Sequence, residues 1–190
     1  NCSIIIPKSG GNDARIMWEG LSTKGIHIVR DVPIVVYAHQ YGLFSSGATM
    51  LMPVETYGYR YYSINYTQVS NYPDSYSWFY VVASENNTRL EITPSDSTEG
   101  GWEPNFTYTV NLNKGEIYNV FGKKTGNYTS KDMTGSKVVS VPGGDALCHP
   151  VAMFSGSSRI TICSGDGGEI LQQQIFPAQA WGTRYLTHHT

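Results

Sequence analysis

The chain has 190 residues, a formal net charge of −2 and only 15% charged residues, and no basic stripe that would contact a nucleic acid backbone. No run of about 18 or more apolar residues occurs, which excludes direct insertion into a membrane as a helix. The length and the 13% of aromatic residues suit one sizeable all-β domain with a substantial core.

The first part of the chain predicts a series of short strands. Apolar and β-branched residues place strands at residues 2–6, 16–18 and 25–30, separated by loops rich in turn-forming residues. Residues 33–39 are almost wholly apolar, so we expect this strand to be fully buried. An apolar strand at the extreme terminus has no sequence neighbour to pair with, which favours pairing far along the chain or addition to another molecule's sheet edge.

The middle part of the chain predicts two hairpins. One joins residues 78–83 to residues 89–93 through an asparagine turn, because asparagine tolerates the left-handed backbone of a tight turn. The other joins residues 106–112 to residues 116–121 through an Asn-Lys-Gly turn. No stretch shows a 3.6-residue apolar period, so helix is expected to be almost absent.

A nine-residue pattern occurs twice, at residues 53–61 and 177–185. Both copies read Pro-x-x-x-aromatic-Gly-x-Arg-Tyr, and the residues of this repeated motif are Pro53, Gly58, Arg60, Tyr61, Pro177, Gly182, Arg184 and Tyr185. Two further pairs of matching stretches precede them in the same order: residues 25–29 with 135–139, and residues 33–37 with 150–154. Matching blocks in a fixed order predict an internal duplication.

We therefore predict an antiparallel β-sandwich-like domain built from a duplicated strand unit with inserted hairpins. Residues 1–190 form a single β domain or two intertwined halves, with copy one at about 16–66, a hairpin insert at about 78–121 and copy two at about 135–187. Because Arg60 and Arg184 recur in both copies, they favour a role in the fold, such as packing on Tyr57 or Trp181.

The three Cys residues favour an oxidising compartment. Residues 151–154 and 159–162 predict a short strand pair that turns between them. Such a hairpin places Cys148 opposite Cys163, so we expect a disulfide between these two residues. Cys2 is then left over, either as a free thiol or as the partner of a Cys in another chain.

No arrangement of residues indicates catalysis or metal binding. Cys148 and His149 are neighbours, so on a strand their side chains point to opposite faces and cannot meet as nucleophile and base. The His residues lack the spacing of metal ligands, and the acidic loops at residues 96–99 and 166–169 lack the carboxylate spacing of a calcium site. We expect no cofactor, no metal and no enzymatic activity; a hydrolase using the acidic loops is the alternative.

Five Asn-x-Ser/Thr triplets mark exposed chain and are acceptor sites for N-glycosylation in a secreted protein. They begin at Asn1, Asn65, Asn86, Asn105 and Asn127.

Much of the chain resembles the N-terminal domain family of IgGFc-binding protein, as found in large secreted surface proteins of Bacteroidetes. The resembling stretches are residues 24–39, 48–66, 78–94, 106–120, 134–139 and 148–186, and they include the segments Lys-Gly-Ile-His-Ile, Pro-Ile-Val-Val-Tyr-Ala-His and Phe-Pro-Ala-Gln-Ala-Trp-Gly. The resemblance implies an extracellular β domain set among repeated modules. Asp96-Ser97-Thr98 is similar to the O-glycosylation motif of those bacteria, which makes Ser97 a candidate. No motif residue for antibody binding can be matched here.

We therefore expect a secreted structural or adhesive module at the cell surface, a subunit or repeat of a surface or filamentous assembly held by β-strand addition. Its partners are further copies of the chain or neighbouring modules. The alternative is a carbohydrate- or glycoprotein-binding module, in which aromatic side chains such as Trp102 and Tyr72 stack on sugars.

Overall fold

A computed structural model describes residues 2–42, 45–162 and 167–187. The strands are β1 (Gly20–Ser22), β2 (Val36–Tyr41), β3 (Ser46–Leu51), β4 (Arg60–Tyr62), β5 (Gln68–Val69), β6 (Ser77–Ala83), β7 (Thr88–Thr93), β8 (Tyr108–Leu112), β9 (Ile117–Phe121), β10 (Thr129–Ser130), β11 (Lys137–Val141), β12 (Val151–Ile160) and β13 (Glu169–Ile175). Within this described part, the only helical elements are two short 3₁₀ turns, η1 (Val54–Thr56) and η2 (Ala178–Ala180). The predicted all-β fold with almost no helix is confirmed.

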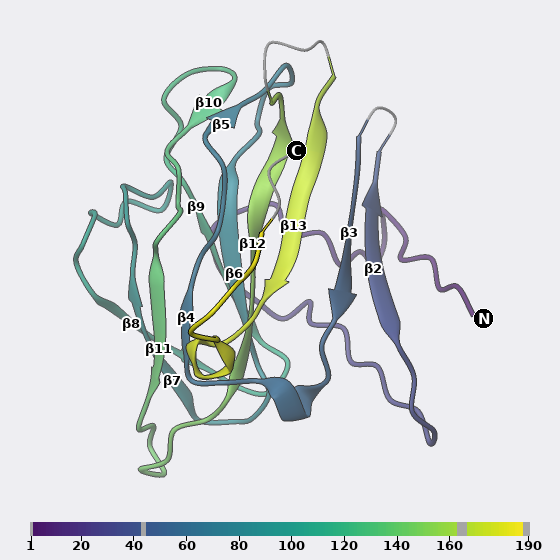
Figure 1. The fold of residues 1–190 in the computed structure, drawn as a ribbon, viewed down its shortest axis with the longest axis vertical. Coiled ribbons are helices and arrows are strands. Elements are labelled where there is room, and N and C mark those ends of the chain that lie inside the picture. The colour runs from purple at the N-terminus through teal and green to yellow at the C-terminus, as the bar shows by residue number, and fades with distance from the viewer. Residues whose placement is uncertain (1, 43–44, 163–166, 188–190) are drawn as a thin grey trace.

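Two antiparallel sheets pack face to face and form the predicted sandwich (Figure 1). One sheet has five strands in the order β1-β9-β6-β12-β13, and the other has four in the order β4-β11-β7-β8. Alternate side chains of both sheets point inward, as expected of strands with one buried face. The core between them contains Tyr61, Phe79, Val81, Leu90, Ile92, Leu112, Val120, Met133, Val138, Val151, Met153 and Ile175.

The two predicted hairpins are wrong, although their strands exist. β6 pairs with β9 and β12 in one sheet, whereas β7 pairs with β8 and β11 in the other. The turns after β6 and after β8 therefore cross from one sheet to the other instead of folding back within a sheet. Turn residues such as Asn87 (φ 56°) and Gly115 (φ 81°) end a strand, but they do not fix which neighbour the next strand pairs with. We call residues 77–121, which form β6 to β9 in this way, the arch unit.

The predicted strand pair between residues 151 and 162 is also wrong. Residues 151–160 form the single strand β12, which lies between β6 and β13. Gly156 is the reason for the misleading turn signal: a Cβ atom there would lie 2.0 Å from the backbone oxygen of Leu171 on β13. Glycine is present because the two backbones approach closely, and not because the chain turns.

The N-terminal strands at residues 2–6, 16–18 and 25–30 are not formed, and the described residues there lie in irregular chain. The stretch at residues 33–39, predicted to be fully buried, is exposed instead. Its regular part begins only at β2, where the Tyr37 side chain is 62% exposed. An apolar strand is buried only when another sheet layer covers it, and no described element covers this one.

The short strand β1 was not predicted from the sequence. It pairs with β9 at the edge of the five-stranded sheet. The carboxylate of Glu19 just before it accepts hydrogen bonds from the Thr98 hydroxyl (2.8 Å) and the Phe121 N–H (3.0 Å). Burial raises the pKa of Glu19. The N-terminal segment is therefore attached to the sandwich at this point.

Candidate binding surface

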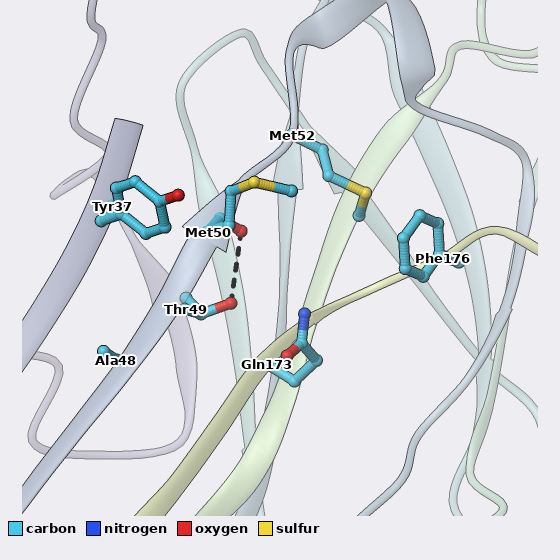
Figure 2. Close-up of a pocket in the computed structure, with 7 residues that line it drawn as sticks. All are labelled: Tyr37, Ala48, Thr49, Met50, Met52, Gln173 and Phe176. Atoms are coloured by element: carbon cyan, nitrogen blue, oxygen red, sulfur yellow. Dashed lines mark hydrogen bonds between the residues drawn. The ribbon is translucent and has the colours of Figure 1, made fainter. Parts of the chain in front are cut away.

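A shallow groove of about 390 Å³ lies between the β2–β3 hairpin and β13. Figure 2 shows the side chains that line it, which come from both strands of the hairpin, from β13 and from the chain just beyond β3 and β13. The lining residues are Tyr37, Ala48, Thr49, Met50, Met52, Gln173 and Phe176.

Side chains, and not a backbone ladder, fix β3 beside β13. The Gln174 N–H donates to the Thr49 hydroxyl (3.0 Å), and the Gln174 side-chain oxygen accepts a bond from the Met52 N–H (2.7 Å). Further along, the Ser46 N–H donates to a Glu169 carboxylate oxygen (2.6 Å). Because Ser46 lies near Glu169 and Met52 near Gln174, the two strands run in the same direction, as Figure 1 also shows.

The groove is apolar and uncharged. Its exposed walls are the side chains of Tyr37, Met50 and Phe176, whereas Thr49 and Met52 are buried at its base. Methionine and aromatic side chains adapt to differently shaped apolar partners. Its lining contains no Asp, Glu, Lys, Arg or His side chain, so it is suited to binding an apolar surface.

An exposed apolar strand edge continues from the groove. Among the described strands, β2 pairs with β3 alone, so its outer edge is free. Apolar side chains on β2 and on the irregular chain before it are exposed: Ile26, Ile28, Val29, Ile34, Val35 and Tyr37. We call these residues the N-terminal apolar surface. A free edge beside such a surface is a template for pairing with another chain.

The repeated motif has the same local structure in both copies. In each, the Pro has an extended backbone (Pro53 φ −67°, Pro177 φ −63°) and is followed by a 3₁₀ turn. In each, the motif Tyr hydroxyl accepts a hydrogen bond from the motif Gly N–H, at 2.8 Å for Tyr61 and 2.6 Å for Tyr185. The two turns also pack on each other, since a Cβ atom on Gly58 would lie 2.4 Å from Cβ of Pro177.

The motif arginines lie on the surface. Arg60 and Arg184 are exposed, and within the described residues neither side chain has a hydrogen bond, ion pair or cation–π contact, although the backbone of Arg60 pairs with Val139 of β11. Neither guanidinium makes a cation–π contact with Tyr57 or Trp181, whereas Trp181 lies against Tyr62 with ring centroids 5.6 Å apart. The motif is recognisable in the structure by its turn and its Tyr–Gly bond.

The family described as IgGFc binding protein matches residues 47–190, well over half of the chain. The chain belongs to the IgGFc-binding protein family. The assignment made from the sequence is thus confirmed. No curated protein and no solved structure shows a significant match. The IgGFc-binding match includes nearly all of β3, both 3₁₀ turns and every strand of the sandwich except β1, whereas β2 and the whole N-terminal apolar surface precede it.

The cysteines of this IgGFc-binding family member do not form the predicted arrangement where they are described. Cys2 and Cys148 are free and exposed thiols. Cys163 lies outside the described residues. The hairpin that was expected to place Cys148 opposite Cys163 is absent, because the intervening strand β12 is continuous and spans about 30 Å at about 3.3 Å per residue. The predicted disulfide therefore loses its geometric basis.

The glycosylation candidates divide by environment. Asn86, Asn105 and Asn127 are exposed in turns and loops, and Ser97 is partly exposed. Asn1 lies outside the described residues. Asn65 differs, since its amide nitrogen donates to the backbone oxygens of Trp78 (2.8 Å) and Gly156. In the folded chain this amide links β6 to β12 and is not free to carry a glycan.

His149 belongs to a cluster that the sequence did not predict. Its ring is buried, with Nε2 2.7 Å from a carboxylate oxygen of Asp145 and Nδ1 3.0 Å from one of Glu85. The hydrogen bond with Asp145, followed by that with Glu85, raises the pKa of His149. The Leu147 N–H and then His149 lower the pKa of Asp145. Cys148 is not a partner in this cluster. The two bonds of His149 connect the loop before β12 to the turn after β6.

Within residues 2–42, 45–162 and 167–187, no three His, Cys, Asp or Glu side chains are arranged so that they could hold one metal ion. None of the helices in the described chain has the length and apolar character that crossing a membrane requires.

Proposed function

We propose that this chain is an extracellular structural or adhesive module that joins neighbouring modules, or further copies of itself, by β-strand addition at the free edge of β2. Its place in the IgGFc-binding family and its acceptor triplets support an extracellular binding role. In this proposal the chain acts by presenting binding surfaces, and the apolar lining of the groove suits that role.

The observation that carries this proposal is the combination of a free strand edge and an apolar surface beside it. Strand addition supplies backbone hydrogen bonds along the edge, and the groove beside β2 supplies apolar contact for the side chains of the added strand. Proteins usually protect exposed edges with charge, proline or a bulge, because an unprotected edge promotes association. Tyr37 is the residue that connects the two features, since it lies on the edge strand β2 and also lines the groove.

The test is sedimentation velocity over a range of protein concentrations. Tyr37→Lys places a charge on the edge strand and is expected to reduce association at least about tenfold. Tyr72→Lys is the matched control, because Tyr72 is 61% exposed, close to the 62% of Tyr37, and belongs to the loop between β5 and β6, neither to β2 nor to the groove lining. A chain that stays monomeric at every concentration, or that associates equally well with lysine at either position, would contradict the proposal.

A second candidate function is binding of a carbohydrate or glycoprotein, which the exposed ring of Tyr72 favours. Trp102, the other aromatic proposed for this role, is already stacked on Tyr108 and Tyr118, with centroid distances of 4.4 Å and 5.3 Å. The test is a glycan array followed by calorimetry. Glycan binding that is lost in Tyr72→Ala and kept in Tyr37→Ala would favour this function over strand addition.

A further inference from the structure

The two copies of the duplicated unit have the same succession of elements. In copy one, the β2–β3 hairpin is followed by Pro53 and η1; in copy two, the β12–β13 pair is followed by Pro177 and η2. β3 and β13 lie side by side and run in the same direction, with β2 and β12 on their outer sides (Figure 1). A half-turn about an axis parallel to these strands, between β3 and β13, therefore relates the two pairs.

Equivalent residues of the two copies differ sharply in exposure. Aligning Gly25 with Gly135 places Ile28 (44% exposed) at the position of Val138 (0%). Aligning Pro33 with Pro150 places Ile34 (49% exposed) at the position of Val151 (0%). The sequence thus supplies core-type side chains in both copies, but only copy two has a layer that buries them.

The arch unit provides that layer for copy two. Its strand β6 pairs with β12, with Met153 opposite Val81. Its strand β7 pairs with β11, with Val138 opposite Ile92. Because these edges of β6 and β7 are already occupied by β12 and β11, the chain's own arch unit cannot also cover copy one.

We propose that the N-terminal apolar surface is the docking site for the arch unit of a neighbouring module, one whose strands equivalent to β6 and β7 are not already paired with strands equivalent to β12 and β11. Docking of that unit completes a second sandwich around copy one. This inference rests on the proposed function and names the strands that the β2 edge accepts. The strand equivalent to β6 pairs along residues 34–37, and the strand equivalent to β7 pairs along residues 27–29. The register follows from copy two: Val36 lies opposite the equivalent of Val81, and Ile28 opposite the equivalent of Ile92.

The experiment supplies the missing layer from the chain's own sequence. Residues 187–190 are replaced by a second copy of residues 63–134, which begins directly after Leu186. Leu186 is the residue of copy two that corresponds to Tyr62 in copy one. The added segment therefore follows the motif of copy two at the same position as the original segment follows that of copy one. Hydrogen exchange of residues 25–41 is expected to slow at least about tenfold relative to the unextended chain, because these residues become paired and buried.

The control is the same extended chain with Val81→Asp in the added copy only, since Val81 is fully buried in the original arch unit. This variant is expected to leave residues 25–41 exchanging as fast as in the unextended chain. Equal exchange in the extended chain and its Val81→Asp variant, whether both are slow or both are fast, overturns the inference.

A cross-link tests the register. In an extended chain whose Cys residues are changed to Ser, Val36→Cys is combined with Val81→Cys in the added copy, because directly opposite residues have Cβ atoms about 4.5–5.5 Å apart. Combining Val36→Cys with Val82→Cys is the control, since a shift of one residue reverses the face. Cross-linking only of the first pair supports the inference, and cross-linking only of the second, or of neither, overturns it. If Tyr37→Lys reduces self-association of the unextended chain as expected, the proposed function stands even when this inference fails.

Discussion

The hydroxyl of Tyr61 donates a hydrogen bond to the backbone oxygen of Val151 (2.6 Å), a residue 90 positions further along the chain. The same hydroxyl accepts the Gly58 N–H at 2.8 Å. Tyr61 is 1% exposed, and this burial raises the pKa of its phenol to about 12, so the hydroxyl stays protonated at any physiological pH. One buried atom therefore joins Gly58, just after the 3₁₀ turn of copy one, to Val151, the first residue of β12 in copy two.

We expect Tyr61→Phe to lower the free energy of unfolding by about 1–3 kcal/mol, because it leaves a buried N–H and a buried carbonyl without this partner. Tyr185→Phe is the matched control. It removes the equivalent Tyr–Gly bond of copy two, but Tyr185 is 71% exposed and water can replace the bond, so the change is expected to stay within about 0.5 kcal/mol. Urea unfolding measures both. Equal decreases in the free energy of unfolding would show that only the Tyr–Gly bond contributes and that the bond from Tyr61 to Val151 adds no stability.

Gly156 gives a second prediction. Gly156→Ala places a methyl group against the Leu171 carbonyl, so β12 and β13 must separate, at a cost of about 1–3 kcal/mol. Gly144→Ala is the control, because a Cβ atom at Gly144 has no neighbour within 4 Å. Thermal unfolding of the two variants compares them. An unchanged midpoint for Gly156→Ala would contradict the close backbone approach and would reopen the interpretation of this glycine as a turn residue.

Gly156 also shows what the sequence can predict and what it cannot. Alternation and turn residues locate most strand ends correctly, because both depend on neighbouring residues. Pairing depends on contacts far along the chain: the predicted turn at Asn87 does separate β6 from β7, yet β7 enters the other sheet. Burial likewise depends on what covers a strand, which is why the equivalent sequences at Ile34 and Val151 have opposite environments. The His149 cluster was missed for the same reason, since Glu85 lies far from it in sequence.

The His149 cluster makes stability depend on pH. The pKa of His149 is raised by Asp145 and Glu85, so the stabilisation is fully present below the ordinary value of about 6.5 and is lost as pH rises through the higher folded value. The pKa of Asp145 is lowered, so its contribution is lost only in acid, below about 4. The midpoint temperature of thermal unfolding is therefore expected to decrease as the pH is raised from 6.5 to 9.

His149→Gln tests this pH dependence. It keeps hydrogen-bonding capacity but cannot carry a charge, so its melting temperature is expected to change less over the same pH range. His27→Gln, at an exposed position, is the control and is expected to follow the wild-type curve. Parallel curves for wild type and His149→Gln would remove His149 as the titrating group.

The thiols give a direct chemical test. Cys2 and Cys148 are free and exposed, so both are expected to react with iodoacetamide in the native chain without a reductant. Peptide mass spectrometry after labelling identifies the modified residues. Labelling of Cys148 only after reduction would instead establish a disulfide and would require the chain around β12 to differ from the strand arrangement described above.

Glycan occupancy is expected to depend on whether the side-chain amide nitrogen of each asparagine donates a hydrogen bond in the folded chain. In a eukaryotic secretory host, the folded secreted chain is expected to carry N-glycans at Asn86, Asn105 and Asn127, whose side chains are exposed. Asn65 is expected to be bare, because a glycan on its amide nitrogen would displace the bonds to Trp78 and Gly156 and leave two carbonyls unpaired. Glycopeptide mass spectrometry of the folded fraction measures occupancy at each triplet. A substantial glycan at Asn65 in that fraction would mean that the segment between β4 and β6 leaves the sandwich in the secreted protein.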